Sequence, residues 1–512
     1  MKAIRLGSAF LTVGVWTLAS RVLGFLRDIL IAAFLGSGPV AEAFLIAFAL
    51  PNMFRRFFAE GAFNMAFVPM FSKKLDGRED ALGFAEDAFS AMAAFLTVFT
   101  LIALALMPWL VLAMAGGFAG DGRLEMATLF GRIAFPYILF ISLAALLSGV
   151  LNASGRFVAA AAAPVLLNVI FVVVLVAANS LDWSIGLALS WAVPLAGVAQ
   201  LGLVWQAAAR AGFALRLKRP ALTPDLRRLA IIAAPAALAG GVVQVNLLIG
   251  RQVASFFDGA IVWLSMADRL YQLPLGVVGI AIGVVLLPDL SRRLRADDTD
   301  GGRRALARAT EISIGLTLPA AVALAVIPEA LVSVLFERGA FTTADTAATA
   351  LALAVYAVGL PAFVLQKVLQ PLFFAREDTR RPFYYALAAM VINAGVAIGL
   401  APMMGYLAAA LGTSVAGWAM VILLWRGSRG MGHAAEMDTQ VFRRLFRVLV
   451  ASIVMGAALW LAEFALSDWL VREGARYIAL SVLVALGVGV YGAVAIVLGA
   501  ISPSEVRAAI TR

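Results

Sequence analysis

The strongest constraint in this sequence is a series of long apolar stretches that contain few charged residues. About 20 consecutive apolar residues form a helix long enough to cross the roughly 30 Å hydrocarbon core of a bilayer. Of the 512 residues, 63% are hydrophobic and 14% are charged, whereas soluble domains carry about 45–50% apolar and about 25% charged residues. The excess apolar surface needs lipid to cover it. The sequence therefore predicts an all-α polytopic membrane protein.

Apolar runs between polar breaks predict about fourteen membrane-spanning helices. No connection between them is longer than roughly twenty residues, so a soluble catalytic domain does not fit between spans. The sequence contains no nucleotide-binding loop, nucleophile elbow or zinc-protease motif, and the chain is expected not to be an enzyme. The expected spans, given to within a few residues, are 8–36, 40–71, 84–115, 126–152, 158–179, 183–207, 229–250, 261–288, 309–328, 346–373, 382–400, 404–425, 445–466 and 477–500.

Lysine and arginine alternate between rich and poor connections along the chain. Of the 40 basic residues, 28 fall in the two terminal segments and in alternate connections, five in the opposite connections and seven within spans. Cytoplasmic connections of membrane proteins carry an excess of lysine and arginine. The alternation therefore predicts an even number of spans, with both termini in the cytoplasm.

The formal net charge of +10 has the same explanation, so no nucleic acid is expected as a partner. The absence of cysteine excludes disulfides, thiol catalysis and cysteine metal sites. The one histidine, His433, lies in a basic connection, and a single histidine does not make a metal site. The first twenty residues have the pattern of a secretory signal peptide. Because the apolar pattern continues through Arg21 to Leu35, this segment is expected to remain as the first span.

Two sets of sequence matches relate the first six spans to the next six. PMFSKKL, which ends at Leu75, and PDLSRRL, which ends at Leu294, lie 219 residues apart. Copies separated by six spans have the same orientation, a parallel repeat that places a substrate path between two lobes. The expected organisation is an N-lobe at 1–220, a C-lobe at 221–430 and two additional helices at 431–512. The second set of matches, 225 residues apart, pairs Pro136 with Pro361, Arg156 with Arg381 and Asn168 with Asn393.

Polar and charged residues within the spans are the candidates for a functional site. A charged side chain at the bilayer centre costs about 2.5–3.5 kcal/mol on insertion scales, so such residues usually face a bundle interior or a wet cavity. Arginine suits bidentate recognition of phosphate and keeps its charge in a poor solvent. These residues predict an anion-binding cavity. They lie in spans 1, 2 and 8: Arg21, Arg27 and Asp28; Asn52, Arg55, Arg56, Glu60 and Asn64; Asp268 and Arg269.

A structural network of ion pairs is the competing interpretation of these residues. Arg56 and Glu60 are four apart and can meet on one helix face, which Asn52 and Asn64 extend. Arg21 and Arg55 have no evident acid nearby in the sequence. Adjacent residues point about 100° apart around a helix, so two further pairs are expected to be poor partners: Arg27 with Asp28, and Arg269 with Asp268.

The sequence resembles the MurJ/MviN family most clearly at spans 1 and 2, in SRVLGFLRDILIAAFLG and AFLIAFALPNMFRRFFAEGAFNMAFVPMFS. The resemblance continues through SGVLNASGRF, DRLYQLPLGVVGIAIGVVLLP, LFERGAFT and KVLQPLFFAREDT. These motifs keep their order and spacing from about residue 20 to residue 380. Chance similarity does not reproduce such an ordered series.

The resemblance implies a lipid II flippase of the MOP exporter superfamily in the bacterial inner membrane. Members have two six-helix lobes around a V-shaped cavity and alternate between inward-open and outward-open states. The substrate implied is lipid II, an undecaprenyl-diphosphate-linked disaccharide pentapeptide. The last two helices would form an apolar groove for its tail, and the protein would act as a monomer among membrane lipids, without a cofactor. By resemblance, the residues that hold the diphosphate are Arg21, Arg27, Arg55 and Arg269.

The second lobe departs from relatives that bind sodium through acidic and amide side chains. Span 7 has no acid and offers only Gln244 and Asn246. Asn393 in span 11 is another candidate oxygen ligand. The residues weigh against a sodium site, and transport is expected to be driven by the membrane potential or by an ion gradient.

Four other functions stay open from the sequence. One is transport of another polyprenyl-linked oligosaccharide. Another is drug export of the MATE type, although exporters of cations are better served by an acidic cavity than by arginines. A membrane-embedded transferase or polymerase generally needs catalytic acids or a large extramembrane loop, and the connections here are short. The fourth is a scaffold that transports nothing.

Overall fold

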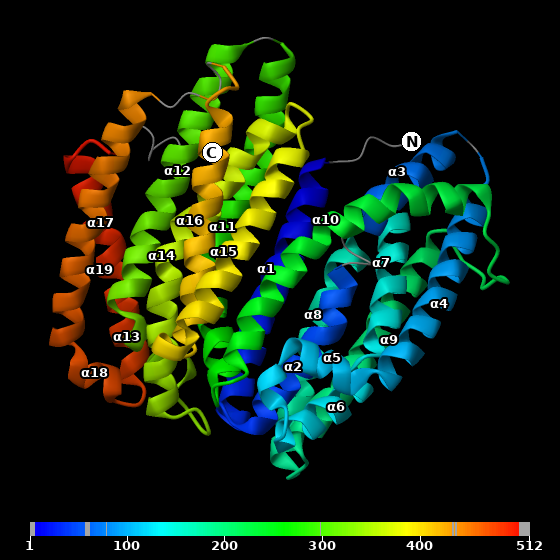
Figure 1. Cartoon of the computed structure of the whole chain (residues 1–512), viewed down its shortest axis with the longest axis horizontal. Coiled ribbons are helices and arrows are strands. Elements are labelled where there is room, and N and C mark those ends of the chain that lie inside the picture. The colour runs from blue at the N-terminus through cyan, green and yellow to red at the C-terminus, as the bar shows by residue number, and fades with distance from the viewer. Residues whose placement is uncertain are drawn as a thin grey trace. The chain divides into compact units, whose positions relative to one another are not determined.

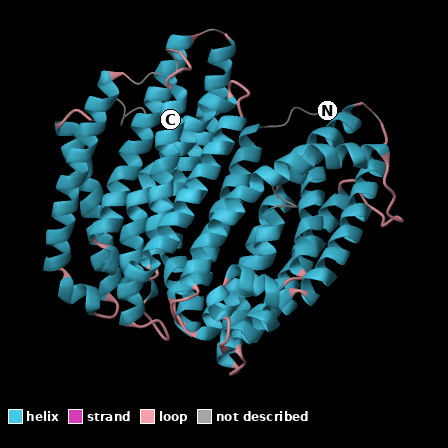
Figure 2. Ribbon diagram, in the orientation of Figure 1, coloured by secondary structure: helices cyan, strands magenta, loops and turns pink. Residues whose placement is uncertain are grey.

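The computed structural model describes residues 6–56, 62–77, 79–296, 298–432, 435 and 438–500. Every regular element in these ranges is a helix, which confirms the predicted all-α class (Figures 1 and 2). The first half contains α1 (Leu6–Leu35), α2 (Pro39–Arg55), α3 (Ala62–Asp76), α4 (Ala81–Ala105), α5 (Met107–Met114), the 3₁₀ turn η2 (Gly116–Phe118), α6 (Gly122–Ala134), α7 (Tyr137–Ala153), α8 (Val158–Ser180), α9 (Ile185–Arg210) and α10 (Pro224–Ala254). The second half contains α11 (Ala260–Arg295), α12 (Thr299–Val326), α13 (Pro328–Phe336), α14 (Thr343–Phe374), α15 (Arg380–Met404), α16 (Leu407–Ser428), α17 (Thr439–Ala465), α18 (Ser467–Val471) and α19 (Ala475–Val497).

Some expected spans are not single straight helices. The second span is divided into α2 and α3, and residues 57–61 between them lie outside the described residues. The third span is divided into α4 and α5, with Pro108 in the first turn of α5. The fourth span has a junction at Pro136, between α6 and α7. Proline lacks the backbone N–H and clashes with the preceding turn, which explains the breaks at Pro108 and Pro136.

Ten helical segments among the described residues are long and apolar enough to cross a membrane. They include the combined segment of α6 and α7. The other four expected spans coincide with α1, with α2 and α3 together, with α10 and with α11. The chain is therefore a multi-pass membrane protein, and the count of fourteen spans stays a prediction.

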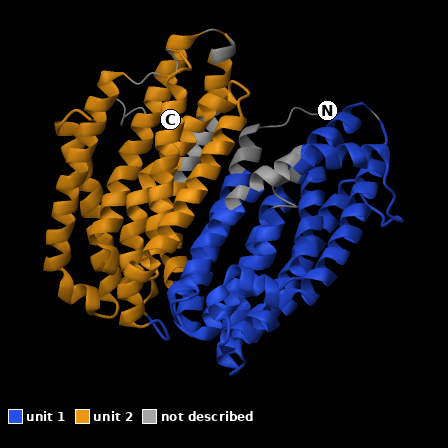
Figure 3. Cartoon of the chain, viewed as in Figure 1, with its two compact units in different colours: residues 1–262, 338–341 blue, residues 263–337, 342–512 orange. Residues whose placement is uncertain are grey.

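The chain divides into two compact units (Figure 3). Unit 1 comprises residues 1–262 and 338–341, and unit 2 comprises residues 263–337 and 342–512. The division falls after α10 and not at the expected lobe boundary of 220/221, because α10 packs on α3 within unit 1. The connection before α10 is also held on α4, where Glu86 Oε1 accepts a hydrogen bond from Arg216 N (3.0 Å) and Ser90 Oγ accepts one from Lys218 N (2.8 Å). The repeat-based lobes remain a prediction from sequence.

Unit 1 is built by helices that are far apart in sequence. α1 packs on α8, α2 packs on α6, and α9 contacts both α7 and α8. Phenylalanine fills much of its interior, with Phe44, Phe67 and Phe171 fully buried. Burial of such side chains is worth about 1.5–3 kcal/mol each, although lipid takes the place of water around the outer faces.

Unit 2 contains α11 to α19. α14 packs against α12 and α16, and α15 packs against α16. The two long helices expected to lie outside the repeat, α17 and α19, pack at the edge of this bundle. α17 packs on α12, and α19 packs on α17. A small apolar core that includes Ile314, Val448 and Ala495 forms where these three helices meet.

Candidate functional site

Arg27 lies at the junction of α1, α2 and α8 and is 6% exposed. Its Nε and Nη2 atoms donate to Asp28 Oδ1, at 3.0 and 2.8 Å, and its Nη1 donates to Asn168 Oδ1 at 3.0 Å. The guanidinium carbon lies 5.8 Å from the ring centroid of Phe48 and 5.5 Å from that of Phe171. Cation–π contacts of this kind are worth about 0.5–2 kcal/mol. Arg27 thus ties three helices of unit 1 together.

The expectation that Arg27 and Asp28 are poor partners was wrong. They form a buried ion pair with an N–O distance of 2.8 Å. Adjacent Cβ atoms do diverge around a helix. However, the arginine stem is long enough to fold back, and burial favours pairing because an unpaired buried charge is costly.

The other arginines of unit 1 are less enclosed than Arg27. Arg21 is exposed on α1, Arg55 is half-buried at the end of α2, and Arg56, the residue that follows, is exposed. Arg21 is therefore the most accessible of the proposed phosphate ligands in this unit. Because one face of α1 packs on α8, the side of α1 that carries Arg21 is left exposed.

The expected polar stripe on span 2 is only partly described. Asn52 donates to Phe48 O at 2.9 Å, within α2. Asn64 belongs to the separate helix α3, where it lies against Gly149 of α7. Glu60 falls outside the described residues, so its pairing with Arg56 stays a prediction.

Asp268 and Arg269 belong to α11 in unit 2. Arg269 is exposed and Asp268 is half-buried. Asp268 accepts a hydrogen bond from Gln272, one turn further along the helix. Tyr271, two residues after Arg269, is buried and stacks on Tyr356 with a centroid separation of 5.2 Å. This packing fixes the rotation of α11 and leaves Arg269 on an exposed face of its unit.

The amide residues considered for sodium belong to different units. Gln244 is buried and Asn246 is half-buried on α10, in unit 1. Asn393 is 1% exposed on α15, in unit 2, and a Cβ added at Gly412 of α16 would lie 2.6 Å from its Oδ1. No group of three or more Asp, Glu, His or Cys side chains suited to a metal occurs in the part of the chain that the structure describes. His433 lies outside that part.

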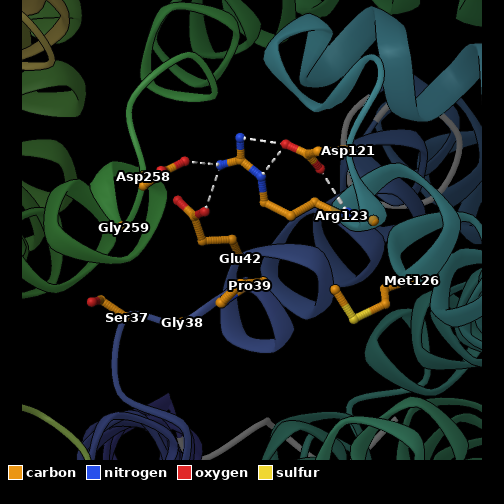
Figure 4. Close-up of a pocket in the computed structure, with 10 residues that line it drawn as sticks. Ser37, Gly38, Pro39, Glu42, Asp121, Arg123, Met126, Asp258 and Gly259 are labelled. Carbon is orange, nitrogen blue, oxygen red and sulfur yellow. Dashed lines mark hydrogen bonds and ion pairs between the residues drawn. The ribbon is translucent and has the colours of Figure 1, made fainter.

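A second polar cluster in unit 1 was not found from the sequence. Figure 4 shows the Arg123 guanidinium among the carboxylates of Glu42, Asp121 and Asp258. Its Nη1 lies 2.8 Å from Glu42 Oε2 and 3.2 Å from Asp258 Oδ1, and its Nη2 lies 2.7 Å from Asp121 Oδ2. Hydrogen bonds from Arg123 hold the pKa of Asp121 below its ordinary value. The cluster borders a cavity of about 530 Å³.

This cluster anchors the turn between α10 and α11. Glu42 Oε1 accepts a hydrogen bond from Ile261 N (3.3 Å) in the first turn of α11, where the helix dipole favours an anion. At the C-terminal end of α10, Gln252 Oε1 accepts a hydrogen bond from Gly116 N and Ser255 Oγ accepts one from Gly117 N, both at 2.9 Å. Glu42 and Arg123 are 81 residues apart, so no local pattern in the sequence indicates that they meet.

Gly117→Ala is expected to lower the thermal unfolding temperature of the purified protein. The added Cβ would lie 2.3 Å from Ser255 O, and this oxygen belongs to the main chain and cannot rotate away. Overpacking of this kind costs about 1–3 kcal/mol. Gly122→Ala is the matched control, since nothing lies within 4 Å of its added Cβ. Equal unfolding temperatures for the two variants in the same detergent would contradict the close docking of η2 on α10.

Unit 2 contains an apolar cavity of about 300 Å³. Three of its lining residues come from α17, and the others come from α12, α14 and α16. The cavity is thus formed by α17 together with α12, α14 and α16, and no residue of α19 lines it. The lining residues are Ile314, Leu318, Pro361, Leu365, Trp418, Leu445, Phe446 and Leu449.

Comparison with solved structures defines the class of protein first. The structure of a lipid II flippase MurJ in an inward closed conformation matches with a TM-score of 0.81 and 22% identity, covering 95% of this chain and 98% of that chain. An inward-facing MATE family transporter of the MOP superfamily matches with a TM-score of 0.70 and 13% identity, over 81% of this chain and 95% of that chain. The fold is therefore that of the MOP-type membrane transporters.

Sequence comparison is more specific. The family model described as lipid II flippase MurJ matches residues 31–480. A probable lipid II flippase MurJ of Rhizobium meliloti is 43% identical, over 98% of this chain and 96% of that protein. A lipid II flippase MurJ of Burkholderia cenocepacia is 35% identical, over 83% of this chain and 84% of that protein. The chain belongs to the MurJ family.

Proposed function

We propose that this chain moves lipid II from the cytoplasmic to the periplasmic leaflet of the bacterial inner membrane. The observation that carries the proposal is the likeness, over nearly the whole chain, to relatives named as lipid II flippases. The likeness to MATE transporters is a likeness of fold, at 13% identity for the one described above. Drug export therefore stays the second candidate, and the arginines in the spans weigh against cationic drugs.

The arginines carry the chemistry of this proposal. Lipid II has a diphosphate that must leave water to cross the bilayer, and moving an ion into a low-dielectric medium costs several kcal/mol unless charge and hydrogen bonds replace its hydration. Arg21, Arg55 and Arg269 supply guanidinium groups suited to bidentate contact with phosphate. Arg27 supports them by holding α1 in place. A head group shifts the inward–outward equilibrium only through its different affinity for the two states.

The tail is proposed to follow an apolar path separate from the head group. A polyprenyl chain is too long to enter a polar cavity and stays in the hydrocarbon. The apolar cavity beside α17 supports this proposal, because Phe446 and Leu449 in its lining are exposed on the unit. Transport needs no cofactor in this proposal, and the membrane potential or an ion gradient drives it in a monomeric protein.

Reporter fusions test the proposed orientation. Basic residues concentrate in alternate connections, and these are expected to face the cytoplasm. Reporters fused after Arg219, Arg304 and Arg512 are therefore expected to lie in the cytoplasm. Reporters fused near Asp182 and Asp258 are expected to lie in the periplasm. A reporter active only in one compartment, such as alkaline phosphatase or green fluorescent protein, makes the measurement. A periplasmic C-terminus would contradict both the orientation and the even number of spans.

Depletion in the parent bacterium tests the proposed substrate. If the chain is the cell's main lipid II flippase, lipid II is expected to accumulate in the cytoplasmic leaflet and cell-wall synthesis to fail. Accumulation of another polyprenyl-linked sugar would favour a different flippase activity. Loss of resistance to cationic compounds with normal lipid II would favour the MATE-type alternative.

A further inference from the structure

Asn168 of α8 contacts α1 at two levels. Its Oδ1 accepts the hydrogen bond from Arg27 Nη1 at 3.0 Å. Its Nδ2 donates to Ser20 O at 2.9 Å and lies 3.4 Å from Ser20 Oγ. Asn168 is 5% exposed. Its hydrogen bond with Arg27 is buried and its contacts with Ser20 are partly buried, and a buried hydrogen bond left unmade costs about 1–3 kcal/mol.

The three α1 positions that face Asn168 form one side of the helix. Ser20, Gly24 and Arg27 are spaced by four and three residues, and residues with this spacing share one helix face. A Cβ added at Gly24 would lie 3.5 Å from Asn168 Nδ2. This is ordinary van der Waals distance, so Gly24 lies directly beside the Asn168 amide on this face of α1.

This contact sets the rotation of α1 and with it the direction of Arg21. Arg21 follows Ser20 directly and points about 100° away from it around the helix, onto the exposed face. Arg27 is on the face of α1 that contacts Asn168, and its guanidinium is surrounded by Asp28, Asn168 and two aromatic rings. The two arginines of α1 thus have different surroundings.

We propose that Asn168 is a positioning residue for transport, which orients Arg27 and holds α1 so that Arg21 faces the phosphate groups of the substrate. Arg27 acts in this arrangement as a brace between α1, α2 and α8. This inference rests on the proposed function, since it assigns Arg21 and not Arg27 to direct contact with the diphosphate.

The test measures lipid II translocation per protein molecule by the full-length chain in proteoliposomes. Asn168→Leu removes both contacts with α1 at similar volume, and a loss of at least about tenfold is expected, equivalent to about 1.4 kcal/mol. Asn179→Leu is the matched control, because Asn179 is exposed near the end of the same helix. The control is expected to transport at the wild-type rate.

A charge exchange separates positioning from general packing. Asp28→Asn removes the carboxylate that pairs with Arg27, and Asn168→Asp places a carboxylate on the other side of the same guanidinium. Each single variant is expected to transport less than the wild type. The double variant is expected to transport better than either, because Arg27 again has one carboxylate and one amide partner. A role in packing alone predicts no such recovery.

Two results would overturn the inference. One is wild-type translocation per molecule in Asn168→Leu. The other is a double variant that transports no better than the better of the two single variants. A wild-type protein that moves no lipid II would overturn this inference together with the proposed function, whereas normal wild-type transport with an unaffected Asn168→Leu variant overturns this inference alone.

Discussion

Alanine at Arg21, Arg55 or Arg269 is expected to abolish or severely reduce lipid II transport while the protein still inserts at normal levels. In the proposed mechanism, each change removes a guanidinium that replaces lost hydration around the diphosphate. None of the three is fully buried in its unit, so the fold is expected to tolerate the loss. Membrane abundance measured beside lipid II translocation separates a binding role from a structural one.

Lysine at the same positions is expected to restore only part of the transport, because it keeps the charge but loses the bidentate fork. Arg27→Ala serves as the contrast. Its guanidinium is buried against Asp28, and removal of one partner of a buried pair costs about 3–5 kcal/mol. Its abundance should therefore fall, and Asp28→Ala should restore it. Stable alanine variants with undiminished transport at Arg21, Arg55 and Arg269 would overturn the proposed site.

Loss of the helices that follow the repeat is expected to abolish transport. Deletion of residues 441–512 removes α17 and α19 and with them one wall of the apolar cavity in unit 2. Residues 1–430 are expected to remain inserted, because their spans do not depend on the deleted helices to reach the membrane. Full transport activity of the truncated protein would contradict the proposed tail groove.

A point substitution tests the groove without removing a helix. Phe446 lines the apolar cavity and is 66% exposed, whereas Phe442, one turn earlier on α17, is 51% exposed and does not line it. Phe446→Gln is expected to slow translocation about tenfold, since a polar group in the tail path raises the barrier by about 1.4 kcal/mol. Phe442→Gln should have little effect. Equal transport by the two variants would contradict the proposed tail path.

The all-α membrane class could be predicted from the sequence because apolar length is a local property of the chain. The all-α class is confirmed, and ten helical segments among the described residues are long and apolar enough to cross a membrane, while the count of fourteen spans stays a prediction. The division of span 3 at Pro108 was missed because the apolar run continues across it. The placement of α10 in unit 1 depends on contacts with α3 and α4, which no repeat pattern encodes. The lobes at 1–220 and 221–430 stay a prediction.

The candidate site was harder to predict because its contacts join distant segments. The sequence indicated Arg27 and Asp28 as unusual residues but not that they pair. It marked Asn168 only as a repeat match, and the contact with Arg27 spans 141 residues. Nothing in the sequence indicated the cluster of Glu42 and Arg123, because each is a single charged residue near the end of an expected span. Such pairs become visible only when the helices are packed.

The most direct test of the account is lipid II translocation by the purified chain in proteoliposomes. Lipid II is placed in both leaflets, and an enzyme added outside modifies only the molecules that it can reach. The wild-type protein is expected to bring the lipid II of the inner leaflet to the outer leaflet, where the enzyme modifies it. With Arg21→Ala, the lipid II of the inner leaflet is expected to stay unmodified. The central claim would be contradicted if, with the wild-type protein, the lipid II of the inner leaflet stayed out of reach of the enzyme under a membrane potential or under imposed ion gradients.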